Sequence, residues 1–174
     1  MVQISDYNFE GKRTLMRVDF NVPLDKQTME VTDDTRIRAA KKTIDHILSK
    51  GGSVVLMSHL GRPKSAGDTE FSLKHIVAHT EKVLGVPVKF GGDCIGEAAY
   101  EMIASLAKGE VMMLENLRFY PEETAGDRAF AEKLAKYGDC YVNDAFGTAH
   151  RAHASTAIVA DFFPSDKMFG FLIE

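Results

Sequence analysis

Short apolar segments of strand length alternate along this chain with segments whose apolar residues recur at helical spacing. We expect strands at residues 14–20, 53–58, 86–90, 111–115 and 140–142, and a sixth at 156–159. We expect one helix from an Asp33 or Asp34 cap to about residue 49, and others at residues 72–84, 95–107 and 127–137. Strands and helices that alternate in this way form a parallel sheet with helices on both faces. The alternation predicts a three-layer α/β/α fold around a mostly parallel, roughly six-stranded, Rossmann-like sheet.

The length and composition of the chain fit one globular domain. Its 174 residues, 45% of them apolar, are expected to form a single domain over residues 1–174. Residues 24–32 are polar and turn-like, and we expect a surface loop there, with a short hairpin as an option. The sequence has no internal repeat and no low-complexity segment.

The net charge, the hydrophobic pattern and the two cysteines indicate which classes of protein this chain does not fit. The net charge of -4 argues against general nucleic-acid binding. No apolar run has the length of a membrane span, and the N-terminus lacks the pattern of a signal peptide. Cys94 and Cys140 lie far apart without metal-type spacing, so we expect two reduced, packed thiols. We therefore expect a cytoplasmic protein without nucleic-acid or membrane partners.

The first expected strand ends in a cluster of polar side chains. Arg17, Asp19 and Asn21 alternate, so in an extended chain they project to one face. Pro23 cannot donate a hydrogen bond within a sheet, so the strand should end before it. Ligands of α/β proteins bind where such strands end. An edge strand with one wet face explains this stretch equally well, so the stretch alone leaves both readings open.

The other strand ends deliver basic residues to the same edge, because right-handed crossovers align parallel strands. The residues expected there after strands are Arg62, Arg118, Arg151, His59, His150 and His153. Arg36 starts the first expected helix, close to the loop that leaves the first strand, and makes four arginines and three histidines in all. Like charges repel unless an anion lies among them, and the arginine fork suits phosphate and carboxylate. The pattern predicts a site for a small polyanion.

Each of these residues also has an ordinary structural interpretation. An exposed arginine is usually solvated, His59 alone suits a structural role, and Asp19 could simply pair with Arg17 or Arg36. We read Glu115, Glu122 and Glu123 as a helix-cap set or a solvated face. The sequence has no Gly-rich P-loop, no Gly-x-Gly-x-x-Gly motif after the first strand and no zinc spacing. We therefore expect no cofactor site and no metal site in this chain.

Five segments of the chain resemble, in the same order, the sequence blocks of phosphoglycerate kinase. They are RVDFNVP at 17–23, DTRI at 34–37, SHLGRP at 58–63, ENLRF at 115–119 and VNDAFGTAHR at 142–151. Enzymes of this family have two α/β domains joined by a hinge. The resemblance implies that this chain is the N-terminal, 3-phosphoglycerate-binding domain of a bacterial-type enzyme. It also implies that Mg-ATP or Mg-ADP binds a C-terminal domain that this chain lacks.

The resemblance also assigns roles to individual residues. The implied substrate contacts are Asp19, Phe20, Asn21, Arg36, His59, Leu60, Gly61, Arg62, Arg118 and Arg151, with His150 and His153 supporting a basic patch. Arg36 is the implied catalytic residue, because it would lie near the transferring phosphoryl group. We expect a monomeric chain that binds 3-phosphoglycerate, a substrate of glycolysis, without transferring phosphate by itself. A non-catalytic anion-binding α/β module is the alternative.

Overall fold

A six-stranded parallel sheet forms the centre of the computed structural model, which describes residues 1–148 and 151–173. The strands are β1 (Arg13–Arg17), β2 (Ser53–Met57), β3 (Val88–Phe90), β4 (Val111–Met113), β5 (Cys140–Asn143) and β6 (Lys167–Phe169). Their order across the sheet is β3-β4-β2-β1-β5-β6, and every neighbouring pair is parallel. The predicted α/β fold with a parallel sheet is confirmed.

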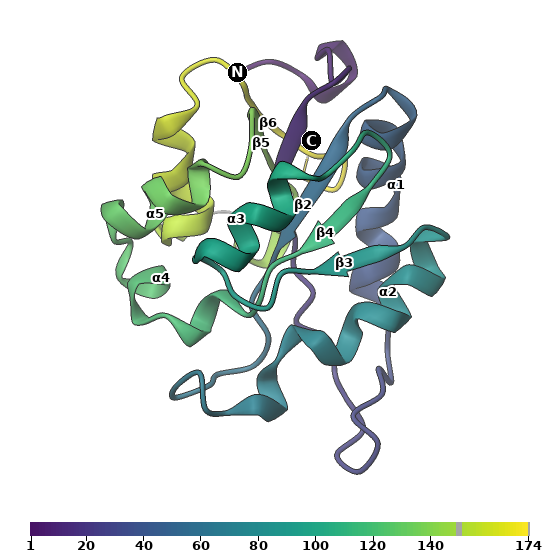
Figure 1. The fold of residues 1–174 in the computed structure, drawn as a ribbon, viewed down its shortest axis with the longest axis vertical. Coiled ribbons are helices and arrows are strands. Elements are labelled where there is room, and N and C mark those ends of the chain that lie inside the picture. The colour runs from purple at the N-terminus through teal and green to yellow at the C-terminus, as the bar shows by residue number, and fades with distance from the viewer. Residues whose placement is uncertain (149–150, 174) are drawn as a thin grey trace.

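Helices cover both faces of the sheet (Figure 1). They are α1 (Thr35–Ser49), α2 (Val77–Leu84), α3 (Glu97–Ala104), α4 (Pro121–Ala125) and α5 (Arg128–Ala135). The helices α1 and α2 pack on one face, and α3 and α5 pack on the other. The expected loop at residues 24–32 folds back on itself, with an antiparallel bridge between Leu24 and Val31.

Successive residues of the central strands feed two separate cores, because side chains alternate across a sheet. On β1, Met16 joins the core under α1 and α2, whereas Leu15 joins the core under α3 and α5. On β2, Leu56 and Val55 divide in the same way. All four side chains are fully buried. Burial on both faces explains why these strands read as continuous apolar runs rather than alternating ones.

The order of the strands creates a crevice at the carboxyl edge of the sheet. β1 lies between β2 and β5, and Leu15 is in register with Val55 on one side and Tyr141 on the other. The chain leaves β1 towards β2, whereas it leaves β5 towards β6. Neighbouring strands whose connections run in opposite directions mark the point where α/β proteins bind ligands.

The strand predicted at residues 156–159 is wrong. Ala154–Ile158 forms a π-helical turn, Val159–Phe162 continues as a 3-10 helix, and the sixth strand is β6. Thr156 is β-branched, but its hydroxyl donates to the Arg151 carbonyl oxygen at 2.7 Å. Such a local side-chain bond competes with strand pairing and overrides intrinsic strand preference.

Some element boundaries also differ from those predicted. β1 ends at Arg17 rather than at Phe20, and the helix expected from residue 72 begins as a 3-10 turn, Leu73–Ile76. α4 was not predicted; Pro121 occupies its first turn and Gly126 ends it in the left-handed conformation. Within the described residues, no helix is long and apolar enough to cross a membrane.

Candidate anion-binding site

A hollow of about 320 Å³ lies at the carboxyl edge of the sheet, where the loops after β1, β2, β4 and β5 meet. The described residues that line it are Asp19, Asn21, Arg36, His59, Gly61, Arg62, Arg118, Gly147, Thr148 and Arg151. In Figure 1 the loops after β1 and β2 both leave the lower edge of the sheet. The hollow therefore occupies the crevice that the strand order creates.

Positive charge dominates this lining. Four arginines line the hollow, and Asp19 is the one carboxylate among the described lining residues. Burial lowers the pKa of Arg118, and the charges of Arg17, Arg151 and Arg62 lower it further. Repulsion of this kind between cations disappears when an anion binds among them. The lining is suited to phosphate and carboxylate groups.

Asp19 and Arg36 join the loop after β1 to the first turn of α1. The Nη1 atom of Arg36 donates to Asp19 Oδ1 at 3.1 Å and to the Asn21 carbonyl oxygen at 3.0 Å. The same carboxylate oxygen accepts the Asn21 N–H at 3.2 Å. Half of the Arg36 side chain stays exposed, so Arg36 is anchored at one nitrogen while it remains accessible to a ligand.

The Asn21 side chain is held by the loop after β2. Its Oδ1 atom accepts the Gly61 N–H at 2.8 Å, so the amide NH₂ is the group left to donate elsewhere. Gly61 has a φ of +61°, and a Cβ atom there would lie 2.4 Å from the Phe71 ring. Only glycine fits this position without strain.

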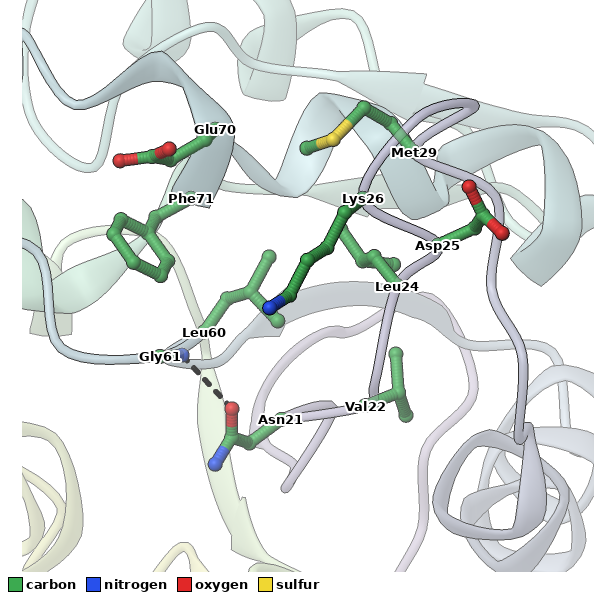
Figure 2. A pocket seen from close by; sticks show the side chains of 10 residues that line it. All are labelled: Asn21, Val22, Leu24, Asp25, Lys26, Met29, Leu60, Gly61, Glu70 and Phe71. Carbon is green, nitrogen blue, oxygen red and sulfur yellow. Dashed lines mark hydrogen bonds between the residues drawn. The ribbon is translucent and has the colours of Figure 1, made fainter.

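A second cavity of about 400 Å³ lies on the other side of the Asn21–Gly61 contact. Figure 2 shows Leu24, Leu60 and Phe71 around it, and the hydrogen bond from Gly61 to Asn21 at its edge. Its charged lining residues are Asp25, Lys26 and Glu70. None of the four arginines lines this cavity, so its described lining does not match the chemistry of a polyanion site.

His59 lies at the base of the hollow on a buried arginine. The Arg17 Nη2 atom is 3.1 Å from His59 Nδ1, and both side chains are buried. Burial, and then the charges of Arg17, Arg118 and Arg36, lower the pKa of His59 to about 2. His59 is therefore neutral at physiological pH and can act as a hydrogen-bond donor or acceptor, but not as a cation.

Three buried polar atoms around the hollow have no hydrogen-bond partner among the described residues. They are Arg118 Nε, Thr148 Oγ1 and His153 Nδ1. Buried polar groups are nearly always paired, so unpaired ones indicate a missing ligand or water. Arg118 and Thr148 line the hollow directly. His153 is buried and does not line it, although the pKa of His153 is lowered by burial and then by Arg118 and Arg17.

The remaining predicted contact residues lie elsewhere. Phe20 is fully buried in the core, and Leu60 lines the second cavity. Neither side chain lines the hollow, so each could affect binding only by positioning the residues next to it. His150 lies outside the described residues. The structure brings the other eight predicted substrate-contact residues together at the hollow.

Sequence reasoning missed several buried residues that hold the site in place. Asn116 is fully buried and bonds four backbone groups of the surrounding loops. The Ser58 hydroxyl accepts the Phe20 N–H at 2.9 Å and donates to the His59 carbonyl oxygen at 2.9 Å. A polar residue at the end of an apolar run, as at Ser58, is the sequence signal that could have revealed such a role.

The interpretation of Glu123 as part of a cap set or solvated face is wrong. Its side chain is fully buried, 3.8 Å from Arg17 Nη2, and it accepts the Ser155 N–H at 2.8 Å. A buried carboxylate needs a cation and donors, and Arg17 and Ser155 supply both. Arg17 itself turns into the protein and does not line the hollow, unlike Asp19 and Asn21.

Neither cysteine is among the described residues that line the hollow. Across residues 1–148 and 151–173, no group of three or more His, Cys, Asp or Glu side chains is placed to hold a metal ion. Cys94 and Cys140 are free and buried, which confirms the expectation of packed thiols. Burial raises the pKa of both thiols, so they are not nucleophiles at neutral pH.

Comparisons with known proteins agree with this arrangement. The family profile described as Phosphoglycerate kinase matches residues 4–174. The chain is 50% identical to phosphoglycerate kinase from Porphyromonas gingivalis and 54% identical to that from Herpetosiphon aurantiacus, with 98% of this chain covered in each case. It spans 46% and 43% of those relatives, less than half their length.

Solved structures give the same result. The phosphoglycerate kinase of Pyrococcus horikoshii OT3 matches with a TM-score of 0.87 at 34% identity, over 99% of this chain and 43% of that one. The enzyme from Coxiella burnetii matches with a TM-score of 0.83 at 32% identity, over 99% of this chain and 42% of that one. The chain therefore belongs to the phosphoglycerate kinase family and corresponds to its N-terminal domain.

Proposed function

We propose that the hollow binds 3-phosphoglycerate and that this chain is the substrate-binding half of a phosphoglycerate kinase. The observation that carries the proposal is the convergence of four arginines on one hollow in an otherwise acidic chain. 3-Phosphoglycerate carries a phosphate and a carboxylate, the two groups that arginine forks bind best. Family membership supports the same substrate.

The proposed division of the hollow follows its chemistry. Of the four arginines that line the hollow, Arg36 forms an ion pair with Asp19. We assign the other three, Arg62, Arg118 and Arg151, to the 3-phosphate. Asp19 and the Asn21 amide are suited to the hydroxyl and carboxylate end of the substrate, because they offer one acceptor and one donor. The substrate would then extend from the loop after β1 to the loops after β2, β4 and β5, which carry these three arginines.

In the proposed reaction, a carboxylate oxygen of 3-phosphoglycerate attacks the γ-phosphorus of ATP. The bond between that phosphorus and the ADP oxygen breaks, giving 1,3-bisphosphoglycerate and ADP. The attacking carboxylate is already ionised at neutral pH, so the reaction needs no general base. Catalysis then depends on positioning and charge stabilisation. A neutral His59 and a lining rich in arginine fit that requirement.

Arg36 is the proposed catalytic residue. Its guanidinium is anchored through Nη1 at the mouth of the hollow and half exposed, so its other nitrogens can reach a phosphoryl group in transfer. Removing a preorganised donor of this kind lowers kcat by about 10² to 10³. Mg-ATP or Mg-ADP would bind a second domain outside this chain, and a hinge would close the two domains over the reactants. We propose that the chain acts as a monomer in the cytoplasm.

Titration of this chain with 3-phosphoglycerate, followed by calorimetry and amide NMR shifts, tests the substrate. We expect saturable binding that weakens as salt rises, and an affinity lower by about tenfold or more in R62A, since hydrogen bonds to charged groups contribute about 1.5–3 kcal/mol. R38A is the matched control, because Arg38 lies on α1 paired with Asp34 and does not line the hollow. Absence of saturable binding at low salt would refute the proposal.

A mixing experiment tests the kinase assignment. The chain alone should transfer no phosphate from ATP, whereas a mixture with a separately produced C-terminal domain of a related enzyme should restore some activity. In that mixture R36A should lower kcat much more than R38A. Binding of 3-phosphoglycerate without any restored activity would favour the non-catalytic anion-binding module instead.

A further inference from the structure

A chain of buried polar contacts runs from α4 to the base of the hollow. Glu123 is fully buried and accepts both the N–H and the hydroxyl of Ser155. The Ser155 hydroxyl oxygen accepts Arg17 Nε at 2.8 Å. Arg17 Nη1 donates to the Val18 carbonyl oxygen, and Nη2 reaches His59 Nδ1 at 3.1 Å. Every nitrogen of the Arg17 guanidinium therefore has a buried partner.

This arrangement fixes the tautomer of His59. Arginine has only donors, so the His59 Nδ1 atom must accept from Arg17 and carry no proton. The single proton of the neutral ring is then on Nε2. Because His59 lines the hollow, Nε2–H is the donor that the ring can offer to an anion there.

The charges around the ring keep it neutral. Burial is the largest cause of the lowered pKa of His59, followed by the charges of Arg17, Arg118, Arg36 and His153. Protonation would also place a proton on Nδ1, directly against the Arg17 guanidinium. A ring in this position is restricted to one protonation state and one tautomer.

Glu123 supplies the negative charge that Arg17 requires. Its carboxylate lies 3.8 Å from Arg17 Nη2, and both side chains have no exposed surface. Removing one partner of a buried ion pair leaves the other charge buried without compensation. The cost in free energy is large enough to displace the remaining charged side chain. Glu123 does not line the hollow, so it can act on a ligand only through other residues. Its hydrogen bonds lead through Ser155 to Arg17 and then to His59, and its charge also offsets part of the lowering of the Arg118 pKa.

We infer that Glu123 is a positioning residue, which through Ser155 and Arg17 holds His59 as the neutral Nε2–H donor of the anion site. The role of that donor in binding 3-phosphoglycerate rests on the proposed function, whereas the tautomer does not. Partners that orient a ligating histidine in metal sites change affinity by about 10- to 100-fold when removed. We expect a loss near the lower end of that range here.

The test uses long-range ¹H–¹⁵N NMR of the full chain labelled at histidine, with His59 assigned by H59Q. The chains compared are wild type, E123Q, S155A and E122Q. S155A keeps Glu123 and its bond to the backbone of residue 155, so it serves if E123Q fails to fold. E122Q is the matched control, because the Glu122 side chain has no hydrogen bond or ion pair within the described part of the chain.

In wild type and E122Q we expect His59 to show one tautomer, protonated on Nε2, with no titration between about pH 5 and pH 8. In S155A, and in E123Q if folded, we expect mixed tautomers or a titrating ring, and about tenfold weaker binding of 3-phosphoglycerate by calorimetry. An unchanged Nε2–H tautomer in the folded variants would overturn the inference, as would a charged or Nδ1–H ring in wild type. Failure of wild type to bind 3-phosphoglycerate would overturn the proposed function, and the ring signals would still decide the inference.

Discussion

Replacing Asn116 by alanine should disconnect two loops that build the candidate site, the one after β2 and the one after β4. The Asn116 amide donates to the Leu60 carbonyl oxygen at 2.7 Å and to the Phe71 carbonyl oxygen at 2.9 Å. Its Oδ1 atom accepts the N–H groups of Leu60 at 3.1 Å and Arg118 at 3.0 Å. One side chain therefore holds the backbone beside Gly61 and the backbone of an arginine that lines the hollow.

The magnitude follows from those four bonds. A hydrogen bond contributes about 0.5–1.5 kcal/mol net, and an unsatisfied buried group costs about 1–3 kcal/mol. The two bonds to Leu60 are buried and the other two are partly buried, so we expect N116A to lower the free energy of unfolding by about 4 kcal/mol. Affinity for 3-phosphoglycerate should fall as well, because the hollow loses the fixed positions of Gly61 and Arg118.

Urea unfolding and calorimetric titration of N116A measure both effects. N8A is the matched control, because Asn8 makes the same kind of side-chain bond once, to the exposed Glu10 N–H at 3.1 Å. We expect N8A to change the free energy of unfolding by less than about 1 kcal/mol. If N116A and N8A destabilise the chain equally, or if N116A binds 3-phosphoglycerate as wild type does, the reasoning is refuted.

Two other substitutions test different parts of the site. A Cβ atom at Gly147 would lie 2.7 Å from Asp19 Oδ2. We therefore expect G147A to displace that carboxylate and to weaken ligand binding by about tenfold, as measured by calorimetry. G67A is the control, because a Cβ atom at Gly67 would lie 3.5 Å from its nearest neighbour, Ser65 Oγ. Burial raises the pKa of Asp144 from 3.8 to about 6, so its contribution to stability is present below about pH 4 and is lost as the pH rises through 6. D144N should therefore raise the free energy of unfolding by up to about 3 kcal/mol at pH 8 and hardly at all near pH 3.5; equal urea midpoints for D144N and wild type at pH 8 would contradict this.

The sequence predicted the layers and the parallel sheet because both depend on local patterns. Continuous apolar runs such as β2 indicate strands buried on two faces, and the helical stripes between them demand parallel crossovers. The order of the strands has no such local signature. β6 escaped detection because Lys167–Phe169 is a short edge strand, paired on one side only, with little apolar pattern.

The residues that line the hollow were predictable for a similar reason. Parallel strands end at one edge, so polar residues after several strands must gather there, as Asn21, His59 and Arg118 do. The buried residues that hold these side chains in place were not predictable, because they contact residues that are far away in the sequence. Arg17 and Ser155 are 138 positions apart, and nothing local to either residue indicates that contact. The prediction that Arg17, Asp19 and Asn21 project to one face was also wrong for Arg17. It assumed an extended strand through Asn21, whereas β1 ends at Arg17.

The electrostatics of the hollow argue that its charges are there for a ligand and not for the fold. Burial, and then repulsion from neighbouring arginines, lowers the pKa of Arg118, and burial beside cations lowers that of His59, so both shifts record a cost to the folded chain. Asp19, the one carboxylate among the described lining residues, already pairs with Arg36. A chain with net charge -4 could have placed acidic residues there at a gain in stability. Cations held together against repulsion are stabilised when a dianion or trianion binds, as are buried polar atoms that have no partner among the described residues. The same free energy then appears as affinity.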